Sequence, residues 1–209
     1  AFDTEGAARD ADLTEYEIGL SFSPAESQWS AVAELSYDDG VSSFETVAVT
    51  YQHSAALSFS FGNIYTYQGL EGHDAHEKDF ISYAGTGSTD LYSANFDEGI
   101  SADYSAGDIT LGVGAEATGS ADFEYYAAYT GIENLALAVA IADNDDNSET
   151  TNIMATYEMG DFTISAENVD TENALGVSTL DVTSVSVADS MGDTTLAVRS
   201  VDGDYGAAS

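Results

Sequence analysis

The sequence predicts an all-β protein built as one antiparallel, up-and-down sheet. About a dozen short stretches alternate residue by residue between apolar or aromatic side chains and a polar set of Ser, Thr, Gly and usually one Glu. In the first stretch Tyr16, Ile18 and Leu20 share one parity, while Glu15 and Glu17 share the other. Successive side chains of a strand point to opposite faces, so each stretch has one apolar and one polar face. We find no helical periodicity that competes with this pattern.

The expected strands follow one another along the chain and are joined mostly by short turns. Pairs such as Gly107-Asp108 and Gly160-Asp161 suit tight turns, because Gly tolerates positive φ and Asp bonds to nearby backbone amides. We expect strands at residues 13–22, 29–37, 44–51, 56–63, 99–104, 108–117, 123–130, 135–142, 151–159, 162–168, 175–188 and 194–201. We interpret residues 1–209 as a single β-barrel domain, open to being incomplete at one or both ends.

One connection, residues 63–98, is much longer than the others. Connections of this length are uncommon inside a compact domain and are usually functional. Its first part, residues 64–72, is aromatic and rich in Gly, residues 73–79 are densely charged, and residues 80–91 contain a weak strand pattern.

The charge of the chain restricts its partners. There are 38 Asp and Glu residues against 3 Lys and Arg, which gives a formal net charge of −35, and there is no Cys. Such a surplus repels nucleic acid and attracts cations, so we expect no nucleic-acid partner. The lack of Cys excludes a disulfide scaffold and a thiolate metal site. No apolar run is long enough for a transmembrane helix, and residues 1–12 lack the pattern of a signal peptide.

Three observations favour a transmembrane β-barrel over a soluble sandwich, in which the apolar faces would point inward. Aromatic residues lie near strand ends on the apolar parity, as in the aromatic girdles of membrane barrels. The apolar parity carries almost no charge, as contact with hydrocarbon requires. About twelve strands in a chain this short leave little else to build a core, and a closed barrel leaves no exposed sheet edge. The aromatic residues are Tyr16, Phe22, Trp29, Tyr37, Phe123, Tyr125, Tyr129 and Tyr157.

Three segments resemble porins of the Gram-negative outer membrane, of the alphaproteobacterial type. They are LSFSFGNIYTYQGLEGHDAHEKDF at residues 57–80, GISADYSAGDITLGVGAE at residues 99–116 and TTNIMATYEMGDFTISAEN at residues 150–168. The resemblance implies a passive channel, commonly a homotrimer, whose third external loop folds into the barrel and narrows it. Residues 64–91 would then be the constriction loop. Its acidic edge would consist of Glu71, Asp74, Glu77 and Asp79.

The chain departs from that family in three respects. It is shorter than a porin of 16 or more strands. It does not end in a strand with a terminal aromatic residue, and it lacks the arginine cluster that faces the acidic loop.

We therefore expect an outer-membrane channel for small hydrophilic solutes that prefers cations and contacts outer-membrane lipid. The predicted pore-lining residues share the polar parity: Glu15, Glu17, Glu34, Glu116, Glu124, Glu158, Glu167 and Arg199. The alternative is an acidic, calcium-associated β-protein of the cell surface, either a layer or filament subunit or an adhesin.

Metal sites and catalysis have weaker support in the sequence. His73 and His76 lie among carboxylates on the long connection, and Asp143 and Asp145 begin like a calcium loop. Ser148 stands where an EF-hand requires Gly, so an EF-hand is rejected while a calcium site stays open. We expect no required cofactor and no enzyme, because no nucleophile elbow or phosphate loop is present.

Overall fold

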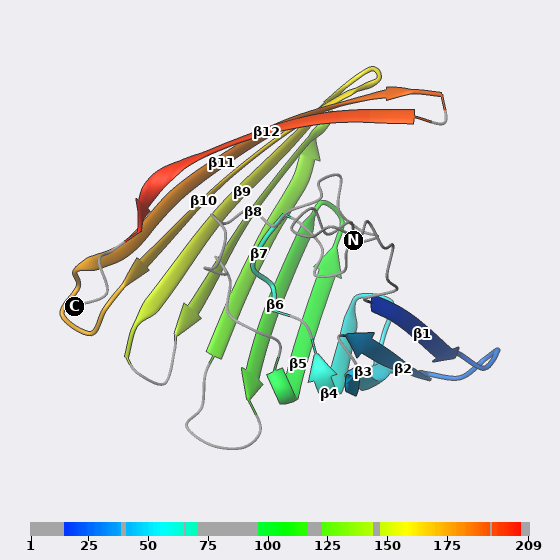
Figure 1. The fold of residues 1–209 in the computed structure, drawn as a ribbon. Helices are drawn as coiled ribbons and strands as arrows, with labels where there is room; N and C mark the ends of the chain where they lie inside the picture. The colour runs from blue at the N-terminus through cyan, green and yellow to red at the C-terminus, as the bar shows by residue number, and fades with distance from the viewer. Residues whose placement is uncertain are drawn as a thin grey trace, which may run out of the picture.

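The computed structural model contains one antiparallel sheet of 12 strands, in which each strand pairs with the next along the chain (Figure 1). It describes residues 15–38, 41–64, 66–70, 96–116, 123–143, 147–192 and 194–205. The strands are β1 (Glu15–Phe22), β2 (Trp29–Asp38), β3 (Val41–Gln52), β4 (Leu57–Ile64), β5 (Phe96–Ala106), β6 (Ile109–Glu116), β7 (Phe123–Ile132), β8 (Leu135–Asp143), β9 (Glu149–Met159), β10 (Phe162–Glu172), β11 (Ser178–Met191) and β12 (Thr194–Tyr205). This confirms the predicted all-β, up-and-down architecture.

The sheet is curved, and the part that the structure describes remains open. In the recorded strand order β1 and β12 are the two edges, so the predicted closure of the barrel is not seen among the described residues. The same residues include no helix that is both long and apolar enough to cross a membrane.

Two of the predicted turns have the expected form. Gly107 and Gly160 have φ values of 60° and 65°, and each is followed by an Asp without positive φ. In both hairpins only two residues separate the last paired positions, which are Ala106 with Ile109 and Met159 with Phe162. Gly at the first central position with positive φ is the pattern of a type II′ turn, which matches the twist of antiparallel strands.

The connection between β10 and β11 differs from the prediction. β10 continues to Glu172, and β11 begins at Ser178 rather than at residue 175. The reason is a local turn in which Asn173 Oδ1 accepts hydrogen bonds from the backbone N–H groups of Leu175 at 2.9 Å and Val177 at 3.2 Å. An Asn side chain that binds the following amides favours a turn over a strand, so Leu175 lies in a loop.

The apolar face of the sheet is uncovered, and the polar face holds the buried residues. Leu20 and Val198 are 70% and 67% exposed, whereas Glu124 and Asn152 are 2% and 0% exposed. A soluble sandwich would show the reverse. The buried apolar clusters are correspondingly small, one formed by Ala48 and Ile64 and another by Val169 and Val182.

One row of aromatic residues on the apolar face lies at the end of the sheet that carries the short turns. Trp29 and Tyr51 occupy opposed positions on β2 and β3, and their ring centroids are 4.7 Å apart. Tyr104, Tyr129 and Tyr157 lie near the corresponding turns of later hairpins and are exposed. Amphipathic rings in such a row fit the boundary between hydrocarbon and water.

Candidate functional site

The candidate site is the polar face of β5–β10 together with the segment of residues 66–70, which we call the crossing segment. In the view of Figure 1 this segment, in cyan, passes in front of β6 and β7. The register of the strands determines which polar-face residues lie in one row beneath this segment. Asp103 of β5 is opposite Gly112 of β6, and Gly112 is opposite Tyr126 of β7. The same row continues through Ala140 of β8 to Asn152 of β9.

Glu124 of β7 is the main anchor of the crossing segment. Its carboxylate accepts hydrogen bonds from the Thr66 hydroxyl, from the Tyr67 backbone N–H at 2.8 Å and from Gln68 Nε2 at 2.9 Å. A carboxylate removed from water is costly unless donors replace its hydration, and these three neutral donors supply that replacement. Glu124 therefore holds three successive residues of the crossing segment against the sheet.

Tyr67 is the residue of the segment that fits most closely onto the sheet. Its ring stacks on Tyr126 with a centroid distance of 5.3 Å and an interplanar angle of 14°. A Cβ atom at Gly112 would lie 2.7 Å from Tyr67 Cζ, so a larger side chain there would displace the ring. The Tyr67 hydroxyl donates to Asp103 Oδ1 at 2.7 Å. Burial first, and then the hydrogen bond to Asp103, raise the pKa of Tyr67 well above its usual value, so this hydroxyl stays protonated at neutral pH.

Two further strands bind the end of the crossing segment. The Gly69 backbone N–H donates to Asn152 Oδ1 at 2.8 Å, and the Leu70 N–H donates to a carboxylate oxygen of Glu167 on β10 at 3.3 Å. Asn152 is itself fixed, because its Nδ2 donates to the Asn168 carbonyl at 3.2 Å. Asp103, Glu124, Asn152 and Glu167 thus attach five consecutive residues across β5, β7, β9 and β10.

The predicted pore-lining residues share one face in register. Glu34, Glu116, Glu124, Glu158, Glu167 and Arg199 all lie on the parity that is opposite the exposed apolar side chains. For Glu15 and Glu17 the structure gives only the backbone pairing, which is with Asp38 and Ser36. Glu124 and Glu167 of this set bind the crossing segment. The pore-lining role of the whole set remains a prediction.

Other predicted site residues lie outside the described part of the chain. These are Glu71, Asp74, Glu77 and Asp79 of the acidic edge, with His73, His76 and Asp145 of the metal candidates. Asp143 is the last residue of β8 and is exposed. No group of three or more His, Asp or Glu suited to a metal occurs among the described residues.

The sequence analysis missed several residues that build the site. Asp103, Asn152 and Tyr126 all lie on the polar parity of their strands, which was the available signal. Gly112 gave a weaker signal, since a Gly within a strand often marks a close approach of another chain segment. Nothing local distinguished Tyr67 from the other aromatic residues of the long connection.

Comparison with solved structures identifies the fold. OmpF of Salmonella typhi in complex with daunomycin is similar with a TM-score of 0.67 and 13% identity, over 97% of this chain and 75% of that one. A mutant of the Rh. blastica porin gives a TM-score of 0.62 and 17% identity, over 91% and 74% of the two chains. A loop-deletion mutant of OmpT, an outer membrane protein of Vibrio cholerae, gives 0.61 and 16%, over 92% and 75%. No protein-family model and no curated protein matches the sequence. The chain therefore has the fold of the outer-membrane porins.

Proposed function

We propose that this chain forms the wall of an outer-membrane channel for the passive diffusion of small hydrophilic solutes. One observation carries the proposal: the apolar face of a porin-like sheet is uncovered, while its carboxylates lie on the opposite face. Exposed apolar side chains are stable against hydrocarbon, and a polar inner face is stable against water. No enzymatic step and no cofactor is part of this function.

The channel prefers cations. Glu34, Glu116 and Glu158 lie on the polar face, where Arg199 is the basic residue among the described positions. A surface with this excess of carboxylates concentrates cations and excludes anions. The test is a reversal potential in a salt gradient across a planar bilayer, with the sign expected for cation selectivity. A potential of the opposite sign would contradict the preference.

The long connection between β4 and β5 narrows the channel. This is supported by the crossing segment, because the first residues of that connection are bound to the polar face. We propose that Glu71, Asp74, Glu77 and Asp79 then form an acidic constriction. Deletion of residues 72–79 is expected to raise the single-channel conductance and weaken the cation preference while the sheet remains folded. Unchanged conductance would remove these residues from the constriction.

The assembly is an outer-membrane homotrimer, a proposal that rests on the porin resemblance. Crosslinking in native membranes followed by denaturing electrophoresis is expected to show a species of three chains. The rival function, a calcium-associated surface protein, predicts instead a protein that is monodisperse or assembles in plain buffer. If the protein needs detergent to stay monodisperse, and a calcium chelator does not change this need, the channel is favoured over the surface protein.

A further inference from the structure

His53 is an exposed residue on the outward face of the sheet, in the turn that joins β3 to β4. It continues the outward parity of Val49 and Tyr51 and lies two residues beyond Tyr51. Its ring contacts confirm this side, because the imidazole centroid is 6.1 Å from that of Tyr51 and 6.5 Å from that of Phe59, which is opposite Tyr51 on β4. The imidazole therefore adjoins the aromatic row that contains Trp29.

The position of His53 along the strand places it at the depth of lipid headgroups. Trp29 and Tyr51 fit the boundary between hydrocarbon and water, and two residues of a strand advance it by about 7 Å. The headgroup layer on each side of a bilayer is about 5–8 Å thick. The short turns of outer-membrane barrels face the periplasm, so the leaflet concerned is the periplasmic one.

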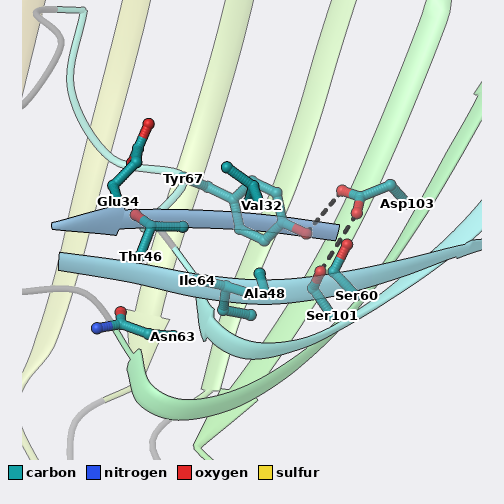
Figure 2. A pocket seen from close by; sticks show the side chains of 10 residues that line it. All are labelled: Val32, Glu34, Thr46, Ala48, Ser60, Asn63, Ile64, Tyr67, Ser101 and Asp103. Carbon is teal, nitrogen blue, oxygen red and sulfur yellow. Dashed lines mark hydrogen bonds between the residues drawn. The ribbon is translucent and has the colours of Figure 1, made fainter. Parts of the chain in front are cut away.

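Positive charge is scarce on this protein, and His53 can supply it on the outward face. Among the described residues only His53 and Arg199 can carry it, and Arg199 lies on the polar face of β12. Two carboxylates of the neighbouring strands also lie on the polar face, where Glu34 and Asp103 line a cavity of about 320 Å³ beside Tyr67 (Figure 2). The sheet thus separates these acids from the imidazole.

The ring nitrogens of His53 have no hydrogen-bond or ion-pair partner in the part of the chain that the structure describes. Its backbone is fixed, because its N–H donates to the Leu57 carbonyl at 2.9 Å and its carbonyl accepts from Gln28 Nε2 at 3.5 Å. The two neighbouring turns contribute Glu26 and Asp108, and neither carboxylate forms an ion pair with it. A fixed turn therefore presents ring donors that are free to bind a group from outside the chain.

We propose that the imidazolium of His53 binds the phosphate group of a membrane phospholipid in the periplasmic leaflet. A cationic N–H donor and a phosphate oxygen form a charge-assisted hydrogen bond, and Tyr51 and Phe59 hold the ring beside the lipid. An imidazole is cationic at about pH 6 and neutral by about pH 8.5, so the contact is made at the lower pH and lost at the higher one. The inference concerns the outward face and is independent of transport.

The single Trp of the chain is a local probe of this contact, because the rings of Trp29 and Tyr51 are 4.7 Å apart beside His53. The protein is reconstituted in bilayers of digalactosyldiacylglycerol, which has no phosphate, mixed with phosphatidylcholine that carries bromine on its acyl chains. Bromine quenches Trp29 when phosphatidylcholine occupies this surface, and the mixture without bromine at the same pH is the reference.

We expect phosphatidylcholine to be preferred about threefold at about pH 6, the modest effect of an exposed ion pair, and not to be preferred at about pH 8.5. Carboxylates stay ionised and phenols, such as those of Tyr51 and Tyr104, stay neutral across this interval, so the imidazole is the group that changes charge.

Two variants of His53 and one control sharpen the test. His53→Gln keeps a polar side chain without the charge and should show no preference at either pH. His53→Lys is cationic at both pH values and should show the preference at both. Glu26→Gln is the matched control, since it changes one charge on the neighbouring turn and should keep the pH-dependent preference of the original protein.

Equal occupancy by the two lipids at the lower pH, or a preference that persists in His53→Gln, would overturn the proposal. Loss of the preference in Glu26→Gln would also overturn it. If an excess of inorganic phosphate abolishes the preference, the site binds a free anion and the assignment to lipid is wrong. If His53→Gln does not fold, absence of the preference at the higher pH in His53→Lys overturns the proposal. The reversal potential of the channel is a separate measurement that none of these outcomes decides.

Discussion

β6–β8 and β10–β12 belong to the same sheet, yet their outward faces differ along the strands. On β8 the outward positions Leu137, Val139 and Ile141 are apolar along nearly the whole strand. On β10 the outward residues change from Ile164, near the short turn, to Asn168, near the longer connection. The neighbouring strands change at the same level. Moving away from the short turn, Val185 gives way to Thr183 on β11, and Val198 gives way to Ser200 and Asp202 on β12.

On the inward face of β10–β12 the residues change from polar to apolar in the same direction along the strands. Glu167 and Ser184 lie nearer the short turn. Farther from that turn, Val169 and Val182 are 0% and 1% exposed and pack with Leu180. On the outward face, Asn168 Nδ2 donates to Asp181 Oδ1 at 2.9 Å and to Thr183 Oγ1 at 3.1 Å. The comparison teaches that the apolar band on the outward face has a limit. Where the strands extend past it, polar groups face outward and apolar groups pack inward, as in a water-exposed sheet.

The largest expected effect tests that limit directly. Val139→Arg should lower the free energy of unfolding by about 2–4 kcal/mol, because the charge enters the apolar band, whereas Thr183→Arg should cost under about 1 kcal/mol. Ala138→Arg, on the inward parity of β8, should also be mild. Urea unfolding in lipid vesicles measures all three. Equal costs at Val139 and Thr183 would show that the band continues past Thr183.

The second effect concerns the inward face of β7. Glu124→Ala leaves three donors of the crossing segment without an acceptor, and we expect a loss of about 2–3 kcal/mol. Glu158→Ala, an exposed carboxylate on the same parity, should change stability by less than about 0.5 kcal/mol. Thermal unfolding in detergent compares the two. A similar cost for both variants would mean that net charge, rather than anchoring, sets the loss.

A third test uses pH. Tyr67→Phe removes the hydrogen bond to Asp103 and should cost about 1.5 kcal/mol at pH 7. Because the folded state raises the pKa of Tyr67, its contribution is complete below the unfolded pKa of about 10 and is lost as the pH rises above it. The difference in stability between the two proteins should therefore shrink above pH 10. A constant difference up to pH 12 would contradict the role of this hydroxyl.

The smallest effect returns to β10. Asn168→Leu should cost about 1 kcal/mol, since Asp181 and Thr183 lose a donor while the new side chain gains no hydrocarbon contact. Ala166→Leu, one outward position closer to the short turn, should instead be neutral or stabilising. Unfolding in vesicles distinguishes them. Stabilisation by Asn168→Leu would place this position inside the hydrocarbon.

The sequence by itself determined which residues share a face and where the chain turns. Glu124 and Glu167 were assigned to the polar parity, and Gly107 and Gly160 to turns, because a period of two and a two-residue turn are local properties. Most strand bounds followed for the same reason. β10 and β12 each extend four residues beyond the prediction, and β11 starts three residues later because the side chain of Asn173 forms a turn that apolar residues alone did not reveal.

Only the tertiary structure decided which of these acids matter to the site. Glu124 and Glu158 share parity and chemistry, yet one is buried beneath the crossing segment and the other is exposed. The difference arises from contacts between residues more than fifty positions apart, such as Glu124 with Tyr67, which no local pattern encodes. The cavity lined by Thr46 and Asp103 has the same origin, since Tyr67, which is seated on Gly112, forms part of its wall.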